Sequence, residues 1–303
     1  MAAAKAGRVR IGISGWRYAP WRGKFYPKGL RQKDELSFAA GKFPTVEING
    51  TFYSLQSPEL FRSWSEATPD DFVFAVKGPR FITHMLKLTQ PERPLANFFA
   101  NGLLALGRKL GPILWQLPPN FRFNAEKLDA FFKLLPRDTA AAAALARHHD
   151  HRVKGRVALE IDRKRRLRHA IEIRHDSFRS PDFIALLRRH RIALVCADTV
   201  EWPLLMDLTA DFVYLRLHGS EELYTSGYDD RALKRWAARV AAWARGAEPR
   251  DAVRVTAKPA AQPAGRSTGL RGRDVYVYFD NDAKVRAPVD AERLIELVSA
   301  TLR

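Results

Sequence analysis

The sequence predicts a TIM (β/α)8 barrel, an α/β fold, as a single domain over residues 1–303. Eight short apolar runs are readable as β-strands, each run ends at polar or ionisable residues, and most of the intervals between runs are readable as helix. In such a barrel the polar groups at the C-terminal ends of the strands converge on one pocket, whereas the opposite face serves mainly stability. The predicted strands are residues 9–15, 45–50, 72–78, 112–118, 169–176, 192–198, 212–219 and 275–282.

Alternation within the runs predicts which side chains point into the barrel, because residues i and i+2 of a strand share a face. Three groups share a face in this way: Glu47 with Asn49, Glu172 with Arg174, and Tyr214 with Arg216 and His218. Charged groups inside a barrel are costly unless they are paired, hydrated or bound to something. The polar strand ends therefore predict a functional site; they are Ser14, Glu47, Asn49, Lys77, Gln116, Glu172, Arg174, His175, Asp198, Arg216, His218, Asp280, Asn281 and Asp282.

Helices between the strands are predicted from caps and from apolar residues at helical spacing. Ser57 and Ser180 are each followed by proline and an acid, a pattern typical of a helix start. Asn124 is predicted to cap a helix that runs through Leu135. Further helices are predicted over residues 95–110, 229–245 and 290–302. Residues 198–211 are too few for a full helix, so we expect an irregular crossover there.

Two insertions interrupt the regular spacing, one between helix 4 and strand 5 and one before strand 8. The first, residues 137–168, begins with an alanine-rich helix, and the second, residues 247–273, is rich in proline and glycine and is predicted to be a long loop. Each lies between a helix and the next strand. We therefore expect both on the N-terminal side of the barrel, away from the site.

Composition restricts the class of protein. No apolar stretch approaches the ~20 residues that span a bilayer, and residues 1–10 contain no apolar core of a secretory signal. These features predict a cytoplasmic protein that does not bind a membrane. The single cysteine, Cys196, excludes an internal disulfide and a cysteine-cluster metal site, and its place in a predicted strand indicates a buried packing residue.

The chain is basic, with 51 Lys and Arg against 33 Asp and Glu and a net charge of +18. Such a charge favours polyanions as partners. The densest cluster, residues 147–169, holds nine Lys and Arg against three acids, and its simplest interpretation is a solvated loop. The HHDH run at residues 148–151 is interpreted in the same way.

The loop over residues 15–33 carries six cations and no acid, interleaved with five aromatic residues. A strand-to-helix loop lies over the catalytic face, where cations attract phosphate or carboxylate and aromatic rings stack on bases or sugars. The alternative is an aromatic plug that closes the barrel mouth, with the cations in water. The aromatic residues are Trp16, Tyr18, Trp21, Phe25 and Tyr26, and the cations are Arg17, Arg22, Lys24, Lys28, Arg31 and Lys33.

Six ordered motifs resemble the signatures of the domain of unknown function 72 family, also called YecE-like. They are TVEINGTFY (45–53), FVFAVKGPRFITH (72–84), ILWQLPPNF (113–121), AIEIRHDSF (170–178), VYLRLHG (213–219) and VYVYFDND (275–282). The resemblance covers nearly the whole chain apart from the two insertions, and it implies a TIM-barrel fold with no established activity. The signature positions are Glu47, Asn49, Lys77, Thr83, His84, Gln116, Glu172, Arg174, His175, Arg216, His218, Asn281 and Asp282.

The predicted function is an enzyme, of the hydrolase, lyase or isomerase type, acting by acid–base chemistry on a small phosphate- or carboxylate-bearing substrate. Catalytic roles are assigned to Glu47, Lys77, His84, Glu172 and His218. Substrate contacts are assigned to Asn49, Arg17, Gln116, Arg174, His175, Arg216, Asn281 and Asp282. The alternatives are a nucleic-acid-binding barrel with endonuclease-like chemistry, a non-enzymatic sensor of an anionic ligand, and a buried ion network that only stabilises the barrel.

No cofactor is predicted. A divalent metal is the alternative, with Glu47, His84, Glu172, His218 and Asp282 as the available oxygen and nitrogen donors. Close-spaced ligand motifs such as H-E-x-x-H are missing from the sequence, and the nearby cations oppose a dication. The sequence also lacks a P-loop, a G-x-G-x-x-G motif and a G-x-S-x-G motif.

Overall fold

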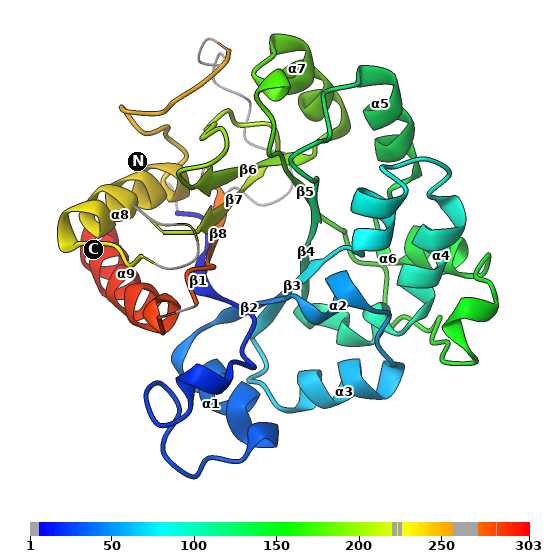
Figure 1. The fold of residues 1–303 in the computed structure, drawn as a ribbon, viewed down its shortest axis with the longest axis horizontal. Coiled ribbons are helices and arrows are strands. Elements are labelled where there is room, and N and C mark those ends of the chain that lie inside the picture. The colour runs from blue at the N-terminus through cyan, green and yellow to red at the C-terminus, as the bar shows by residue number, and fades with distance from the viewer. Residues whose placement is uncertain (1–5, 220–222, 224–225, 257–271, 283) are drawn as a thin grey trace, which may run out of the picture. The chain divides into compact units, whose positions relative to one another are not determined.

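The computed structural model describes residues 6–303 except 220–222, 224–225, 257–271 and 283. Eight parallel strands form a closed barrel in which neighbours follow chain order (Figure 1). The predicted TIM barrel is therefore confirmed. The strands are β1 (Val9–Ser14), β2 (Thr45–Ile48), β3 (Val73–Lys77), β4 (Leu110–Gln116), β5 (His169–Glu172), β6 (Ala193–Asp198), β7 (Phe212–Leu217) and β8 (Asp274–Phe279).

The three helices for which the sequence predicts a cap begin directly after that residue. The Ser57 hydroxyl accepts a hydrogen bond from the Leu60 amide, and the Asn124 side chain accepts one from the Lys127 amide. Ser180 occupies the predicted N-cap position, but its side chain makes no capping hydrogen bond. The helices are α1 (Glu35–Lys42), α2 (Gly50–Tyr53), α3 (Pro58–Glu66), α4 (Glu92–Ala100), α5 (Ala125–Leu134), α6 (Thr139–Ala146), α7 (Pro181–His190), α8 (Asp230–Ala244) and α9 (Arg286–Leu302).

The helix predicted over residues 95–110 is wrong as a single element. Helix α4 ends at Ala100, and two short 3-10 turns separated by a kink at Gly107 follow over Leu103–Lys109. Gly102 between them has φ 103°, and a Cβ added there would lie 2.4 Å from the Cα of Pro58. Only glycine fits this close approach at a positive φ, so the chain must break the helix at this residue.

The remaining segments follow the predictions, except that the closing helix starts earlier than predicted and that most of the second insertion is not described by the structure. Residues 199–211, all of them described, contain no helix, so the irregular crossover is confirmed. The alanine-rich start of the first insertion forms α6, as predicted. The closing helix begins at Arg286, one turn before the predicted residue 290. Most of the second insertion, residues 257–271, lies outside the described residues.

The described chain consists of two compact units. The first comprises Met1–Ser14, Tyr18–Leu30 and Asp176–Arg303, and the second comprises Gly15–Arg17 and Arg31–His175. In the first unit β7 pairs with β6 and β8, β8 pairs with β1, and α8 lies beside α9 (Figure 1). In the second unit β2 to β5 pair in order, and α4 packs on α6. That the whole chain acts as one domain stays a prediction.

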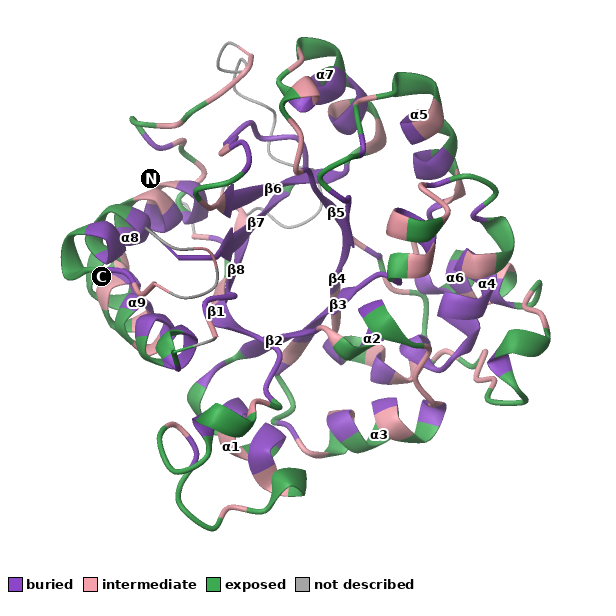
Figure 2. Cartoon of the chain, viewed as in Figure 1, coloured by how far each residue is buried: buried purple, intermediate pink, exposed green. Residues whose placement is uncertain are grey.

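The strands are buried on both faces, as Figure 2 shows by their colour. Every residue of β2 and of β7 is buried, including Glu47 and Arg216. Cys196 is 2% exposed, which confirms it as a packing residue, and burial raises the pKa of its thiol. None of the described helices combines the length and the apolar character needed to cross a membrane.

A buried Trp–His pair joins β4 to β5. Trp115 Nε1 donates a hydrogen bond to His169 Nδ1 over 3.2 Å, and His169 Nε2 lies 2.8 Å from the carbonyl oxygen of Pro136. His169 is therefore the tautomer with its proton on Nε2. Burial lowers its pKa to about 4, although the Pro136 hydrogen bond acts in the opposite direction.

Candidate functional site

Four strands of the second unit end in buried polar side chains. Glu47 lies on β2, Lys77 ends β3, Gln116 ends β4 and Glu172 ends β5. Their exposed fractions are 0%, 8%, 5% and 0%, although all four side chains are polar. In the β4–β5 register Gln116 lies directly opposite Glu172. Since parallel strands are apolar on both faces when their task is only structural, this end of the second unit is a candidate site.

Arg174 holds two of these side chains together. Its Nε lies 2.8 Å from Glu172 Oε1, and its Nη2 donates to Gln116 Oε1 over 3.0 Å. The Arg174 side chain is 10% exposed and that of Glu172 is 0% exposed, so the pair is almost fully removed from water. Alternation predicts that Glu172 and Arg174 share a face, and their contact agrees with this. The planar guanidinium gives the pair a fixed orientation.

Lys77 is placed by the short helix that follows β2. The Thr51 hydroxyl donates to the Lys77 carbonyl oxygen over 2.7 Å, which ties α2 to the end of β3. Phe52, the next residue of α2, lies beneath the ammonium group, with Nζ 4.3 Å from the ring centroid. A cation over an aromatic face is stabilised by the quadrupole of the ring.

His84 lies in a π-helical turn over Phe81–Met85. Its Nδ1 is 2.9 Å from the hydroxyl oxygen of the buried Thr83, and its ring meets that of Phe52 edge to face at 5.1 Å. The pKa of His84 is lowered to about 4, mainly by burial and in addition by the positive charges of Arg174, Lys77 and Arg80, whereas the charge of Glu172 acts in the opposite direction. The imidazole is therefore neutral at pH 7. Single π-helical turns occur frequently at functional sites.

The other predicted residues of the second unit lie in different surroundings. Asn49 is half-buried at the N-cap position of α2, and His175 is half-buried after β5. Arg17 is exposed. The carbonyl oxygen of Glu47 accepts a hydrogen bond from the Gly15 amide. Substrate contacts by Asn49, His175 and Arg17 stay predictions.

The first unit contains a second polar cluster, centred on Asp280. Asp280 Oδ2 lies 2.8 Å from Arg216 Nη2 and 3.1 Å from His218 Nδ1. Arg216 Nη2 also donates to the Ser14 hydroxyl oxygen over 3.1 Å. Arg216 and His218 are 0% exposed. These contacts join the ends of β1, β7 and β8, which favours a stabilising role for Arg216.

Three further hydrogen bonds hold the ends of β6 and β8 in the first unit. Asn281 donates from Nδ2 to Asp290 of α9 over 2.8 Å and to the Ser226 carbonyl oxygen over 3.0 Å. Trp236 of α8 donates from Nε1 to Asp198 over 3.1 Å, at the end of β6. Burial raises the pKa of Asp198. The Asn281 amide thus fixes the chain after β8, and its contact with a substrate stays a prediction.

Asp282 has an unusual titration. The pKa of its carboxyl is raised to about 6, mainly by burial and in addition by the negative charge of Asp280. Its carbonyl oxygen accepts a hydrogen bond from Trp21 Nε1 over 3.1 Å. A carboxyl group whose pKa is raised toward neutrality is suited to exchange protons with a substrate as a general acid or base.

The loop over residues 15–33 agrees with the plug interpretation. Trp21, Tyr26 and Trp16 are 0%, 1% and 6% exposed, so their faces are not available for stacking on a base. Trp21 packs against Tyr18, Phe25 and Tyr26, and Trp16 packs against Trp64. The cations are exposed, and Arg31 pairs with Asp34 at 2.7 Å.

Within the described ranges, no three His, Cys, Asp or Glu side chains come together as metal ligands would. The structure brings Lys77, His84, Gln116, Glu172 and Arg174 together in the second unit. In the first unit it brings Arg216 and His218 together. The convergence of all the predicted residues on a single cavity stays a prediction.

Three residues with clear roles in the clusters were not among the predicted site residues. Asp280 is the shared partner of Arg216 and His218, although the sequence identifies it only as a strand end. Arg80 acts on His84 through its charge, and Phe52 contacts both Lys77 and His84. Arg80 and Phe52 lie in loop and helix segments, where strand alternation gives no signal. Their position inside the two motifs 45–53 and 72–84 was the available indication.

Comparison with known proteins gives consistent matches. A family model described as "Protein of unknown function DUF72" matches residues 10–303. The UPF0759 protein YecE of Escherichia coli K12 is 32% identical over 113 residues, which cover 37% of this chain and 39% of YecE. The UPF0759 protein YunF of Bacillus subtilis is 26% identical over 125 residues, 40% of this chain and 43% of YunF. These matches span about two fifths of the length of each curated relative.

Solved structures match over almost the full length. A DUF72 family protein of Thermotoga maritima, TM1631, has a TM-score of 0.70 at 23% identity and covers 96% of this chain and 99% of its own. A DUF72 family protein of Enterococcus faecalis, EF0366, has a TM-score of 0.62 at 16% identity, with 97% of this chain and 98% of its own covered. At these identities the likeness shows the fold alone.

Proposed function

Because this chain belongs to the DUF72 family, whose description names no reaction, we propose its function from the chemistry of its residues: it is an enzyme that binds a phosphate- or carboxylate-bearing substrate and transfers a proton on it. The proposal rests on the cluster of the second unit. A location in the cytoplasm is part of the proposal and rests on the sequence alone.

The position of His84 beside the ring that also lies under Lys77, in a cluster with Arg80, Arg174 and Glu172, is the observation that carries this proposal. His84 shares its surroundings with Lys77, Arg80 and Arg174, whose positive charges all disfavour an imidazolium. An anionic group bound among these cations offsets their charge and makes protonation of His84 easier. Substrate binding therefore moves the His84 pKa toward the operating pH, where a general acid or base is most effective.

We assign proton transfer to His84, stabilisation of its protonated form to Glu172 and binding of the anion to Arg174. In the tautomer in which His84 Nδ1 carries the ring proton and donates it to the Thr83 hydroxyl oxygen, Nε2 has the free lone pair that accepts and then returns the substrate proton. The Glu172 carboxylate stabilises the imidazolium, since its charge raises the His84 pKa. Arg174, held by Glu172 and Gln116, is oriented to bind the anion with part of its guanidinium. This proton transfer needs no cofactor.

Sulfate should raise the pKa of His84 from about 4 toward the ordinary value of ~6.5. Sulfate suits the test because its charge is constant over this range. The measurement is a pH titration of the histidine side chains by ¹⁵N NMR, with and without sulfate, and His84→Gln assigns the signal. By linkage, sulfate must then bind more tightly as the pH falls through the His84 pKa.

His169 provides the internal control for this titration. Its pKa, also about 4, is set mainly by burial, so sulfate should leave it unchanged. Identical His84 titration curves with and without saturating sulfate would contradict the proposal. Equal shifts of His84 and His169 would also contradict it, because they would indicate a general effect of ionic strength.

A nucleic-acid partner is the second candidate, favoured by the exposure of the basic insertion. Arg147, Arg152, Lys154, Arg156 and Arg166 are all exposed there. Some nearby cations are paired, as Lys164 is with Asp138. Binding through several phosphates should weaken steeply with salt, with a slope of log K against log [salt] of about −0.9 per duplex phosphate contact. Fluorescence anisotropy with a labelled DNA duplex at several salt concentrations measures this slope, and a slope near zero would exclude the candidate.

A further inference from the structure

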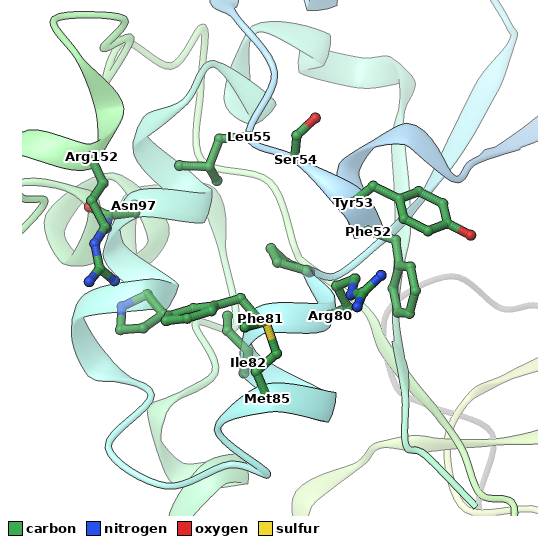
Figure 3. A pocket seen from close by; sticks show the side chains of 12 residues that line it. Phe52, Tyr53, Ser54, Leu55, Arg80, Phe81, Ile82, Met85, Asn97 and Arg152 are labelled. Carbon is green, nitrogen blue, oxygen red and sulfur yellow. The ribbon is translucent and has the colours of Figure 1, made fainter.

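A pocket of about 480 Å³ lies within the second unit (Figure 3). Its wall is formed by α2 and the turn that follows, by the segment after β3, by α4 and by Arg152 of the first insertion. Small-molecule sites typically measure roughly 300–1,000 Å³. The sequence places the first insertion away from the predicted site, yet the structure brings Arg152 to this pocket.

The lining carries positive charge only. Arg80 and Arg152 are its two charged residues, and no carboxylate lines the pocket. Neither arginine forms a salt bridge with any residue that the structure describes. In Figure 3 Arg152 and Asn97 lie on one side, Arg80 and Phe52 on the other, and Phe81 between them. Two arginines at separate places in an acid-free wall favour an anionic ligand.

The rest of the wall is aromatic and apolar. Phe81 lies under the Arg152 guanidinium, whose Cζ is 5.3 Å from the ring centroid. Tyr53 and Met85 are 69% and 64% exposed, the two most exposed large hydrophobic side chains in the described part of the chain. Exposed apolar groups that gather beside a pocket mark a binding surface, and methionine adapts its shape to flat rings. The wall therefore fits a planar apolar group.

Phe52 joins this pocket to the His84 cluster. The ring lines the pocket, contacts the His84 ring at 5.1 Å and lies 4.3 Å from Lys77 Nζ. Arg80 likewise lines the pocket and acts on His84 through its charge. A ligand in the pocket that reaches Arg80 thus brings its anionic group to the cations of the cluster.

From these contacts we infer that the pocket is the specificity subsite of the enzyme, and that it accepts a planar aromatic ring joined to a phosphate or carboxylate, in the size range of a nucleoside monophosphate. This inference rests on the proposed function for the role of His84. The pocket itself selects the ring, and Arg80 and Arg152 select the charge.

The methionines allow ligand binding to be located. The chain has three, and Met206, which is 2% exposed, serves as the internal reference. In the full chain labelled with ¹³C at the methionine methyl groups, adenosine 5′-monophosphate should shift the Met85 signal in a saturable way and leave the Met206 signal in place. Met85→Leu assigns the signal. Ribose 5-phosphate, adenosine and 1-naphthoate separate the contributions of the phosphate, the ring and a carboxylate.

We expect the monophosphate to bind at least about tenfold more tightly than either ribose 5-phosphate or adenosine, since both halves of the site are then used. Arg80→Gln and Arg152→Gln should each weaken binding about tenfold or more. Arg62→Gln is the matched control, because Arg62 is an exposed arginine of α3 that does not line the pocket. It should bind as the wild type does.

Several results would overturn the inference. The first is a Met85 signal that does not move with any of the aromatic anions at ~10 mM, a concentration well above typical ligand dissociation constants. The second is equal affinity for the monophosphate and for adenosine. The third is a loss of affinity in Arg62→Gln as large as the loss in Arg80→Gln or Arg152→Gln. Failure of the proposed function has a different signature. The ligand then shifts Met85 and responds to Arg80→Gln, but the His84 pKa does not rise when the ligand binds.

Discussion

Replacing Asp280 with asparagine should lower the free energy of unfolding by about 3–5 kcal/mol, the usual cost of breaking a buried ion pair from one side. Asp280 is the carboxylate that Arg216 and His218 share, and Arg216 is 0% exposed. Without that charge the guanidinium stays buried against a neutral amide and cannot reach water. Urea denaturation at pH 7, followed by circular dichroism, measures the loss.

Asp251→Asn is the matched control. Asp251 also binds an arginine, with Arg239 Nη2 at 2.7 Å, but the Asp251 side chain is 51% exposed. Exposed pairs contribute about 0–1 kcal/mol, so this variant should unfold almost as the wild type does. If Asp280→Asn cost no more than Asp251→Asn, the Asp280 cluster would not be a stabilising network, and a functional role for Arg216 would become the better interpretation.

Replacing Glu172 with glutamine should reduce turnover of an aromatic anion by up to about 10²- to 10⁴-fold, because this is the range that a proton-transfer group such as His84 typically contributes and the variant removes the carboxylate that stabilises protonated His84. Glu172 orients Arg174 and stabilises protonated His84. Glutamine keeps the size of the side chain and removes the charge. Initial rates are measured with ligands that shift Met85, and the His84 pKa should fall further in the variant because the one carboxylate that raises it is gone.

The effect of Glu172→Gln on stability should be smaller than that of Asp280→Asn. The Arg174 side chain is 10% exposed, and Gln116 still accepts one of its hydrogen bonds, whereas Arg216 has no access to water. Glu59→Gln, on the exposed face of α3 in the same unit, is the control; it should leave the rate unchanged and should affect stability much less than a buried ion pair does. Loss of stability by ~3–5 kcal/mol with no change in the His84 pKa would instead indicate a purely structural ion pair.

The barrel could be predicted because its strands carry their own signal. Each apolar run ends at a polar residue, and the two-residue period predicts that Glu172 and Arg174 share a face, which agrees with their contact. However, β5 ends at Glu172 and β8 ends at Phe279, so Arg174, Asp280 and Asp282 all lie beyond their strands, where alternation no longer fixes the face. A pairing such as Asp280 with Arg216 depends on contacts 64 residues apart along the chain.

The break in the predicted helix over residues 95–110 had a tertiary cause. The approach of Gly102 to Pro58 cannot be read from apolar periodicity, which continues across the glycine. The pocket could not be predicted from the sequence either, because its wall forms only when distant segments pack together. These segments are α2, the residues after β3, α4 and one arginine of an insertion. Local patterns therefore predict the elements and many site residues, while the shape of the pocket arises from how these elements pack.

The Trp115–His169 pair makes the folded protein sensitive to acid. Because Trp115 already donates to His169 Nδ1, a second proton on the imidazole would place two N–H groups against each other. The unfolded chain takes up this proton near pH 6.5, whereas the folded chain does so only near pH 4. Stability is therefore lost as the pH falls through this window, by up to about 3 kcal/mol from this residue. Acid therefore lowers the free energy of unfolding through a buried group between β4 and β5, and not through the Lys and Arg side chains of the surface, whose charge does not change in this pH range.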